Sequence, residues 1–180
     1  MKLTHYFDAF MNNTVNLADY KLRSLKTSVD ALYGALQADT ELGPIVEDMD
    51  PQGSWAQKTI IKQVEGKEFD ADFMIVLTEQ EGWTPKQYIN AVFNALRRNG
   101  NYKDKVKKKN RCVRVTYAND YHVDIVPFLC LSTGRQVICN AETDEWEDTD
   151  PDEFTAWMKR RDDTAKGNLR RTIRLMKYLR

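Results

Sequence analysis

Residues 53–77 read GSWAQKTIIKQVEGKEFDADFMIVL, and this stretch contains the clearest strand pattern and the most unusual charges of the chain. Its last nine residues alternate as a strand does, with apolar side chains at every odd position from Phe69 to Leu77 on one face. Asp70 and Asp72 project from the other face of this predicted strand. Aspartate is depleted in strands, and an unpaired buried carboxylate costs free energy. The pattern therefore indicates a functional site at the start of a core strand.

A third aspartate, Asp124, interrupts a second apolar run, YHVDIVPFL at residues 121–129. If the two predicted strands lie side by side, Asp124 points into the same space as Asp70 and Asp72. Three converging carboxylates repel one another and raise each other's pKa unless a cation neutralises them. Oxygen ligands of this kind suit Mg²⁺ or Mn²⁺, and three carboxylates can hold two such ions about 3.5–4 Å apart.

The Gly53-Ser54 pair supplies groups that bind phosphate. Glycine lets the backbone approach a phosphate closely, and serine offers a hydroxyl and an exposed N–H. If a helical turn begins here, its N-terminal dipole adds to the attraction for an anion. A lone Gly-Ser or D-x-D is weak evidence, because both are common in loops and at solvated strand edges. Their combination with Asp124 favours metal-assisted phosphoryl transfer from a nucleoside triphosphate.

The residues before the Gly-Ser pair have the periodicity of one long amphipathic helix, from Asn16 to about Asp39. Its apolar stripe consists of Leu17, Leu25, Val29, Leu32 and Leu36. Gly43-Pro44 is expected to end this helix. The acidic segment VEDMDPQ at residues 46–52 is then expected to be a connector that leads to the Gly-Ser pair.

The residues after the D-x-D strand predict a helix, a β-hairpin and a further strand. Thr84-Pro85 provides the N-cap and first-turn proline of a helix that ends at Asn99-Gly100. The hairpin joins CVRVTY at 112–117 to YHVDIVPFL around Asn119-Asp120. RQVIC at 135–139 is the further strand. The basic run that precedes the hairpin, KDKVKKKNR, favours a solvated loop over a ligand site.

Two more helices are expected near the end of the chain. Asp150-Pro151 opens the first, with Phe154, Trp157 and Met158 as its buried side, and Asn168 can cap the second. The second has an apolar stripe that continues to the end of the chain without a cap or glycine. We therefore expect a catalytic core at residues 1–165 and, at 166–180, the first helix of a truncated C-terminal helical domain.

The composition is that of an ordinary globular protein of 180 residues, with 42% hydrophobic and 30% charged residues. Lys+Arg and Asp+Glu both number 27, so no overall field attracts nucleic acid or a membrane. The three cysteines lack metal-ligand spacing, which favours reduced thiols. The N-terminal residues contain no apolar run long enough for a signal peptide or a membrane span. A cytoplasmic protein without membrane partners is expected.

GSWAQKT, FDADFMIVL and VDIVPFL together resemble the signature of the polymerase-β-like nucleotidyltransferase superfamily. Within it, they resemble the CD-NTases, bacterial cyclic-oligonucleotide synthases of anti-phage signalling that are related to cyclic GMP-AMP synthase. The long helix before the Gly-Ser pair is similar to the spine helix of that family, and residues 146–180 are similar to its passage into a helical lobe. The resemblance implies an α+β fold, with a mixed sheet flanked by helices and the start of that lobe.

The resemblance also implies roles for individual residues. Asp70, Asp72 and Asp124 would ligate two Mg²⁺ (or Mn²⁺) ions, with Asp124 near the acceptor hydroxyl. Gly53 and Ser54 would hold the β- and γ-phosphates of the donor. The nucleotide would also be contacted at two further positions, Lys58 and Thr59. A ribose hydroxyl would then attack the α-phosphate and release pyrophosphate.

The expected function is synthesis of cyclic or short linear oligonucleotide messengers from NTPs in anti-phage signalling, by a monomer with accessory defence proteins as partners. A nucleic-acid activator is not implied, because no Cys/His cluster suggests a zinc insertion. One alternative is a nucleotidyltransferase that modifies RNA, protein or a small molecule. Another is a non-catalytic nucleotide-binding module. If most of the helical lobe is missing, this chain is expected to be poorly active.

Overall fold

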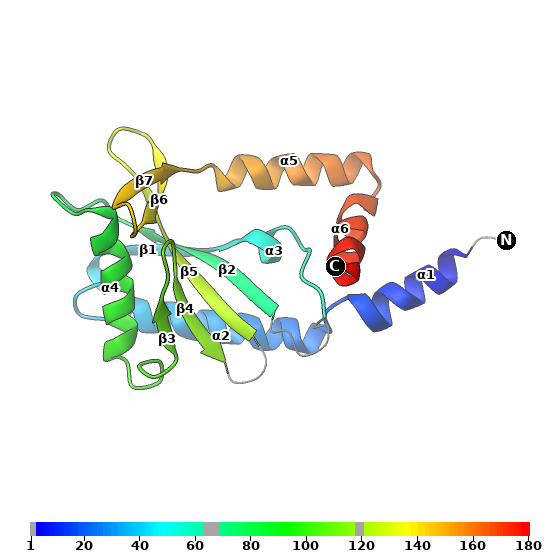
Figure 1. Cartoon of the computed structure of the whole chain (residues 1–180), viewed down its shortest axis with the longest axis horizontal. Coiled ribbons are helices and arrows are strands. Elements are labelled where there is room, and N and C mark those ends of the chain that lie inside the picture. Colours follow the sequence, from blue (N-terminus) through cyan, green and yellow to red (C-terminus); the bar gives the residue numbers. More distant parts are fainter. Residues whose placement is uncertain (1–2, 63–68, 118–120) are drawn as a thin grey trace.

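The computed structural model describes residues 3–62, 69–117 and 121–180. One mixed sheet forms the centre of the molecule (Figure 1). Its strands, in spatial order, are β1 (Val46–Gln52), β2 (Phe69–Leu77), β5 (Tyr121–Cys130), β4 (Val113–Tyr117) and β3 (Val106–Lys108), with β6 (Gln136–Asn140) and β7 (Glu145–Asp148) continuing from β5. Only β2 and β5 run parallel among these pairs. The α+β fold with a mixed sheet flanked by helices is confirmed.

The hydrophobic core lies on the odd-numbered face of β2. Phe73 and Ile75 are buried there with Ile125 of β5, as the alternation predicted. Helices α2 (Asp19–Gln37) and α4 (Pro85–Arg98) contribute their apolar stripes to the same core. The even-numbered face carries the aspartates and lies outside this core, although Met74 on the same face is also buried.

The N-terminal part contains the long helix that the sequence predicts, preceded by α1 (Thr4–Phe10) and a π-helical turn, Met11–Val15. The expected connector at 46–52 is wrong, because these residues form the edge strand β1, antiparallel to β2. Its acidic residues hide the strand pattern, and Pro51 is tolerated because an edge strand leaves some N–H groups unpaired. As a result, β1 ends at Gln52 beside Asp72 of β2, and the Gly-Ser pair follows directly at this point.

The middle of the chain follows the prediction except at its basic run. The amide of Thr84 donates to Gln87 Oε1 (2.6 Å), which caps α4 where expected. The β4–β5 hairpin forms, while its expected turn at Asn119-Asp120 lies outside the described residues. The expected loop after α4 is only partly right, since Val106–Lys108 pairs with β4 as an edge strand. Exposed lysines are typical of sheet edges.

Strand β6 occupies the position predicted for RQVIC, but β7 was not anticipated. It pairs antiparallel with β6 from Val137↔Asp148 to Asn140↔Glu145. Its sequence, EWED, is only four residues long and mostly acidic. No local period marks such a strand, so pairing with β6 decides its conformation.

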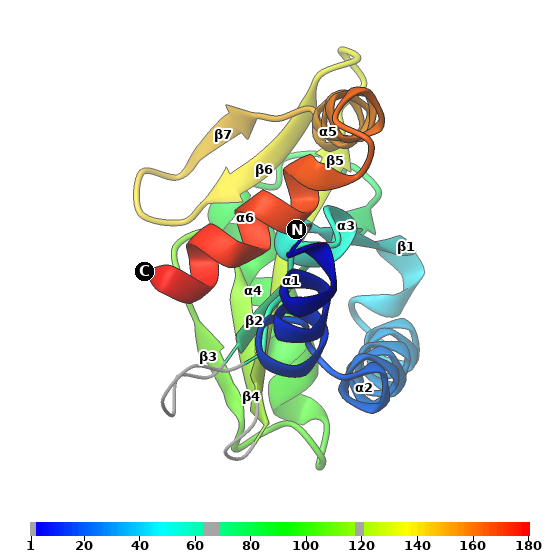
Figure 2. The same ribbon diagram turned by 90° about the vertical axis from the view of Figure 1, so that its right-hand side faces the viewer.

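Helices α5 (Pro151–Thr164) and α6 (Asn168–Leu179) follow β7 and approach the aspartate-bearing side of the sheet (Figure 2). Met158 is buried as expected, but Phe154 and Trp157 are wrong as core residues, being 53% and 42% exposed. They stack on each other at the surface of α5. Asn168 is not the N-cap either, because Gly167 takes that position with φ +80°. No helix in the described ranges is long and apolar enough to cross a membrane.

Candidate active site

The aspartates come together through the register of the two parallel strands. Asp72 of β2 is paired directly with Asp124 of β5, and Asp70 is paired with His122. Paired residues on neighbouring strands project from the same face, so all three carboxylates are on the even-numbered side of the sheet. The convergence that the sequence suggested for Asp124 depends on this register, since a shift by one residue would turn its side chain into the core.

The three carboxylates differ in burial. Asp124 is 7% exposed, Asp72 is half-buried and Asp70 is exposed. Burial raises the pKa of Asp72 to about 6, and the negative charges of Asp70 and Asp124 contribute to the rise. Opposing effects from His122 and Arg114 are smaller. The site therefore carries unbalanced negative charge, which suits a cation.

Arg114 of β4 forms a bidentate ion pair with Asp124, which was not expected from the sequence. Its Nε lies 2.7 Å from Asp124 Oδ1, and its Nη2 lies 2.7 Å from Oδ2. The two residues are register partners in the hairpin. The alternation of Val113, Arg114 and Val115 is the signal that could have revealed it, because both valines are buried in the core and Arg114 must face the aspartates.

The donor set is chemically suited to Mg²⁺ or Mn²⁺, because all three groups are carboxylates. Burial and, to a smaller extent, the charges of Asp70 and Asp124 raise the pKa of Asp72, and a cation would offset both effects. In the ranges 3–62, 69–117 and 121–180, however, no three acidic, histidine or cysteine side chains stand close enough to hold an ion as they are arranged. Both oxygens of Asp124 accept hydrogen bonds from Arg114. A bound cation must therefore share Asp124 with the guanidinium or displace one of these hydrogen bonds.

The Gly-Ser pair begins a single helical turn, α3 (Gly53–Ala56), which lies against β2. Gly53 has φ +57°, and a Cβ at this position would overlap Oδ2 of Asp72. Glycine is therefore required both by the backbone and by the approach of the aspartate. Trp55 packs its ring against Phe73, with 5.8 Å between centroids, and this contact holds the turn on the strand. The predicted phosphate-binding turn and metal-binding strand are in direct contact.

Lys58 and Thr59 follow this turn but contact α6 mainly through their backbone. The carbonyl oxygen of Lys58 accepts a hydrogen bond from Arg174 Nη1 (3.0 Å). Lys177 Nζ lies 3.3 Å from the carbonyl oxygen of Thr59 and 3.4 Å from its Oγ1. Thr59 is buried, whereas the Lys58 side chain is exposed and lines a pocket of about 460 Å³ with Ser54 and Arg174.

Three basic residues of α6 face this segment and were also not expected. Arg170 Nε donates to the carbonyl oxygen of Gln57 (2.9 Å), and Arg174 and Lys177 follow at the spacing of one helical face. Burial lowers the pKa of Lys177, while the charges of Asp70 and Asp72 act in the opposite direction. Lys177 therefore lies within electrostatic reach of the two aspartates. The i, i+4, i+7 spacing in RRTIRLMK is the signal that could have found this face.

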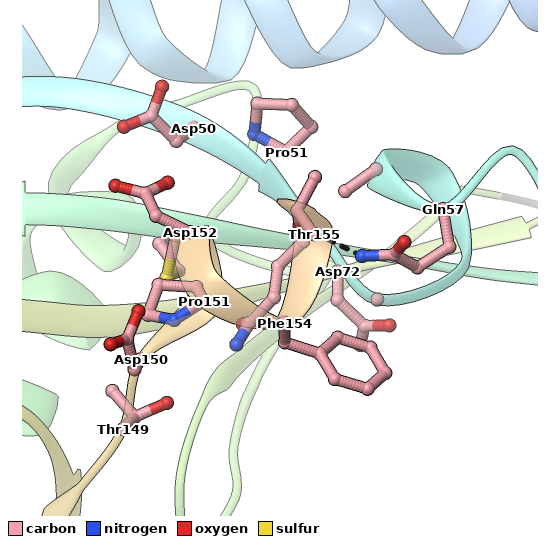
Figure 3. Close-up of a pocket in the computed structure, with 14 residues that line it drawn as sticks. Asp50, Pro51, Gln57, Asp72, Thr149, Asp150, Pro151, Asp152, Phe154 and Thr155 are labelled. Carbon is pink, nitrogen blue, oxygen red and sulfur yellow. Dashed lines mark hydrogen bonds between the residues drawn. The ribbon is translucent and has the colours of Figure 1, made fainter. Parts of the chain in front are cut away.

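A second pocket, of about 510 Å³, opens beside Asp72 (Figure 3). The figure shows Asp72 and Phe154 at one side and the carboxylates of Asp50 and Asp152 at the other. Gln57 Nε2 donates to Thr155 Oγ1 (2.9 Å) and thereby connects the residue that follows α3 to the first turns of α5. The pocket thus joins the Gly-Ser turn, β2 and α5 around one carboxylate of the site.

The fold, a mixed sheet with flanking helices, is similar to that of polymerase-β-like nucleotidyltransferase cores. Residues 1–162 match the SMODS family, the Second Messenger Oligonucleotide or Dinucleotide Synthetase domain. The chain belongs to this family and hence to the CD-NTases that its motifs resemble.

Three relatives illustrate the similarity. A c-di-GMP synthase of Roseivirga ehrenbergii is 32% identical over 121 residues, which cover 66% of this chain and 32% of that protein. Vibrio cholerae DncV cyclic AMP-GMP synthase with nonhydrolyzable GTP has a TM-score of 0.77 at 16% identity, covering 96% of this chain and 65% of that one. E. coli MS115-1 CdnC with ATP has a TM-score of 0.69 at 21% identity, covering 96% and 55%. The chain spans only part of each relative.

Proposed function

We propose that this chain is the catalytic core of a metal-dependent nucleotidyltransferase that makes cyclic or short linear oligonucleotides from NTPs. The observation that carries the proposal is that Asp72 and Asp124 are register partners on the parallel strands β2 and β5, and that the turn at Gly53 lies against Asp72. A carboxylate pair beside a turn that can bind phosphate suits metal-assisted phosphoryl transfer. Membership in a family of second-messenger synthases supports it.

Asp70, Asp72 and Asp124 would hold the divalent cations, with Mg²⁺ or Mn²⁺ as the fitting ions. When bound, such ions neutralise phosphate charge and lower the pKa of an attacking hydroxyl. Asp72 and Asp124 would orient the attacking hydroxyl of the acceptor. Because Asp124 is buried, its surroundings would limit the access of water that competes with this hydroxyl. The predicted assignment of Asp124 to the acceptor hydroxyl remains part of this proposal.

The triphosphate would be held by groups from both sides of the contact between α6 and residues 57–59, which follow α3. Ser54 supplies a hydroxyl, and the Gly53 turn brings the backbone close to Asp72. Lys58, Arg174 and Lys177 supply positive charge around the same turn. Charge-assisted hydrogen bonds from such groups are the strong contacts of phosphate sites. Thr59 serves mainly to position Lys177.

A nucleoside would occupy the pocket beside Asp72. Its volume of about 510 Å³ lies within the range of small-molecule sites. Phe154 lines it and remains 53% exposed, so its ring is available for stacking against a base. The ring already stacks on Trp157 and contributes nothing to the buried core, which favours a role in binding.

The test is incubation of the protein with each labelled NTP, singly and mixed, with Mg²⁺ or Mn²⁺, followed by chromatography of the products. We expect small oligonucleotide products that Asp72→Asn abolishes and the exposed control Asp163→Asn retains. Products that appear only with an added RNA, protein or small-molecule acceptor would instead favour a modifying nucleotidyltransferase. Metal-dependent NTP binding without any product would favour a binding module.

Several further properties belong to the same proposal. A role in anti-phage signalling with accessory defence proteins is suggested by the family, and a cytoplasmic location and a monomeric state are further parts of the proposal. A catalytic core at residues 1–165 and a helical domain from 166 onward is the proposed division of the chain. It is supported by the start of α6 at Asn168.

A further inference from the structure

Arg114 and Asp124 form a fully paired charge contact at the centre of the site. Both guanidinium–carboxylate distances are 2.7 Å, and the side chains are 28% and 10% exposed. Register partners on a hairpin hold their side chains in fixed positions, so this contact is built into the sheet. Two parallel hydrogen bonds between these groups give both strength and orientation.

The surroundings of Asp124 show what the guanidinium does. Asp72 of β2 faces it directly, with Asp70 one step away on the same face. Among the described residues, His122 on its own strand and Cys112 just before β4 are further titratable groups nearby, and Lys177 of α6 acts on Asp70 and Asp72. Because Arg114 donates to both oxygens of Asp124, it supplies the main charge compensation of this carboxylate.

Arginine differs from lysine in that its charge cannot be removed by deprotonation in a protein. A metal ion that approaches Asp124 must therefore share the carboxylate with a fixed positive charge or displace one of its two hydrogen bonds. Either event opposes binding of the ion. In the metal-free protein, the same charge prevents the buried Asp124 from repelling Asp72 at full strength.

We propose that Arg114 is a positioning residue that takes the place of a divalent cation at Asp124 and sets the affinity of the site for that cation. This inference rests on the proposed function, because it assigns Asp124 to the metal site. Arg114 acts through Asp124, and its effect has two parts. It stabilises the metal-free protein, and it weakens metal binding so that ions are exchanged rather than retained.

The experiment is calorimetric titration of the metal-free 180-residue protein with Mn²⁺, without nucleotide, together with thermal unfolding at each Mn²⁺ concentration. For Arg114→Met we expect a Kd for Mn²⁺ about tenfold lower than that of the unmodified chain, because one positive charge near the ion is lost. We also expect a lower Tm without metal and a larger rise of Tm with metal. For Arg114→Lys, the Kd for Mn²⁺ and the Tm should lie between the values of the unmodified chain and those of Arg114→Met.

Arg111→Met is the matched control. Arg111 makes a similar bidentate ion pair with Glu147, in which its Nε and Nη2 lie 2.6 and 2.8 Å from the carboxylate oxygens. Its side chain is more exposed than that of Arg114, and its partner is not one of the three aspartates. Its loss should leave the Kd for Mn²⁺ unchanged. In an Asp124→Asn background, Arg114→Met should alter the Kd much less than it does in the unmodified chain, because the inferred effect passes through Asp124.

An unchanged or higher Kd in Arg114→Met, with a folded protein, overturns the inference. If that variant does not fold, Arg114→Lys decides the question by the same criterion. Failure of the proposed function has a different signature, in which the unmodified chain shows no Mn²⁺ binding that Asp72→Asn removes. Metal binding that is sensitive to Asp72 but insensitive to Arg114 overturns only the role of Arg114.

Discussion

Gly53 lies directly against Asp72, so that a side chain at position 53 would overlap the Oδ2 atom of the aspartate. This contact joins two motifs that are distant in the sequence, a Gly-Ser turn and a D-x-D strand. It explains why the turn and the strand occur together. The turn can bring its backbone to the carboxylate of Asp72 only if residue 53 has no side chain.

Gly53→Ala should therefore reduce both stability and activity. Its φ of +57° disfavours alanine, and the new methyl group displaces Asp72. We expect a loss of about 2–4 kcal/mol in the free energy of unfolding by urea, together with loss of NTP binding. Gly82→Ala separates the two causes, because Gly82 also has positive φ (+75°) but a methyl group there would meet no atom within 4 Å. Equal losses for both variants would contradict the role of the Asp72 contact.

Asp72→Asn should make the metal-free protein more stable at pH 8 while abolishing activity. The pKa of Asp72 is raised to about 6 from 3.8 in the folded protein, so the folded state holds its proton more tightly than the unfolded chain. Stability therefore falls as pH rises from about 4 to about 6, by up to about 3 kcal/mol. Asparagine does not ionise, so this loss does not occur in the variant. The free energy of unfolding of Asp72→Asn should therefore be higher than that of the unmodified chain at pH 8 and equal to it near pH 4.

The measurement is urea unfolding in EDTA at both pH values, with the exposed Asp163→Asn as the control. Asp124→Asn provides the opposite case. It removes the partner of Arg114 and leaves a guanidinium without its buried carboxylate, so it should lower stability at pH 8. A decrease in stability for Asp72→Asn at pH 8 would show that burial and the neighbouring carboxylates do not destabilise the charged form of Asp72.

Lys177→Met should weaken NTP binding about tenfold or more without unfolding the protein. Lys177 contacts the oxygens of Thr59 and lies within electrostatic reach of Asp70 and Asp72, where a triphosphate would be bound. The measurement is the Kd of a nonhydrolysable NTP in Mg²⁺. Lys159→Met, at an exposed lysine on α5, is the matched control and should bind normally. Equal affinity in both variants would place the triphosphate elsewhere.

Phe154→Ala and Met158→Ala should have opposite consequences although they lie one turn apart on α5. Met158 is 8% exposed, so its truncation should cost about 2–4 kcal/mol of stability with little effect on nucleotide affinity. Phe154 is 53% exposed and lines the pocket beside Asp72, so its truncation should cost less than about 1 kcal/mol. It should weaken nucleotide binding about fivefold or more through lost stacking. Unfolding curves and NTP titrations of both variants check this contrast.

The local signals in the sequence were sufficient for the elements that contain their own pattern. The alternation in FDADFMIVL, the capped stripe of α4 and the apolar runs of the β4–β5 hairpin each predicted the observed element. The unusual position of Asp70 and Asp72 in a strand indicated the site, because a charge in a core strand needs a partner or a ligand.

The sequence was less informative where pairing between distant segments decides the structure. β1 and β7 are acidic strands whose conformation comes from their neighbours β2 and β6. Phe154 and Trp157 look like core residues, but α5 turns them outward while Met158 faces in. The residue type alone does not show which strand an acidic segment will pair with. It also does not show which side of a helix a neighbouring element will cover.

The donor chemistry of the site could be inferred from the residues alone: three aspartates, a glycine that can approach them, and strands to carry them. The fold was needed to see that Asp72 and Asp124 are register partners, that Arg114 donates to both oxygens of Asp124, and that Lys177 reaches the same region from α6. The physical reason is that strand alternation fixes the face of each side chain within one strand. Register and helix docking, which depend on the whole fold, fix which of those faces meet.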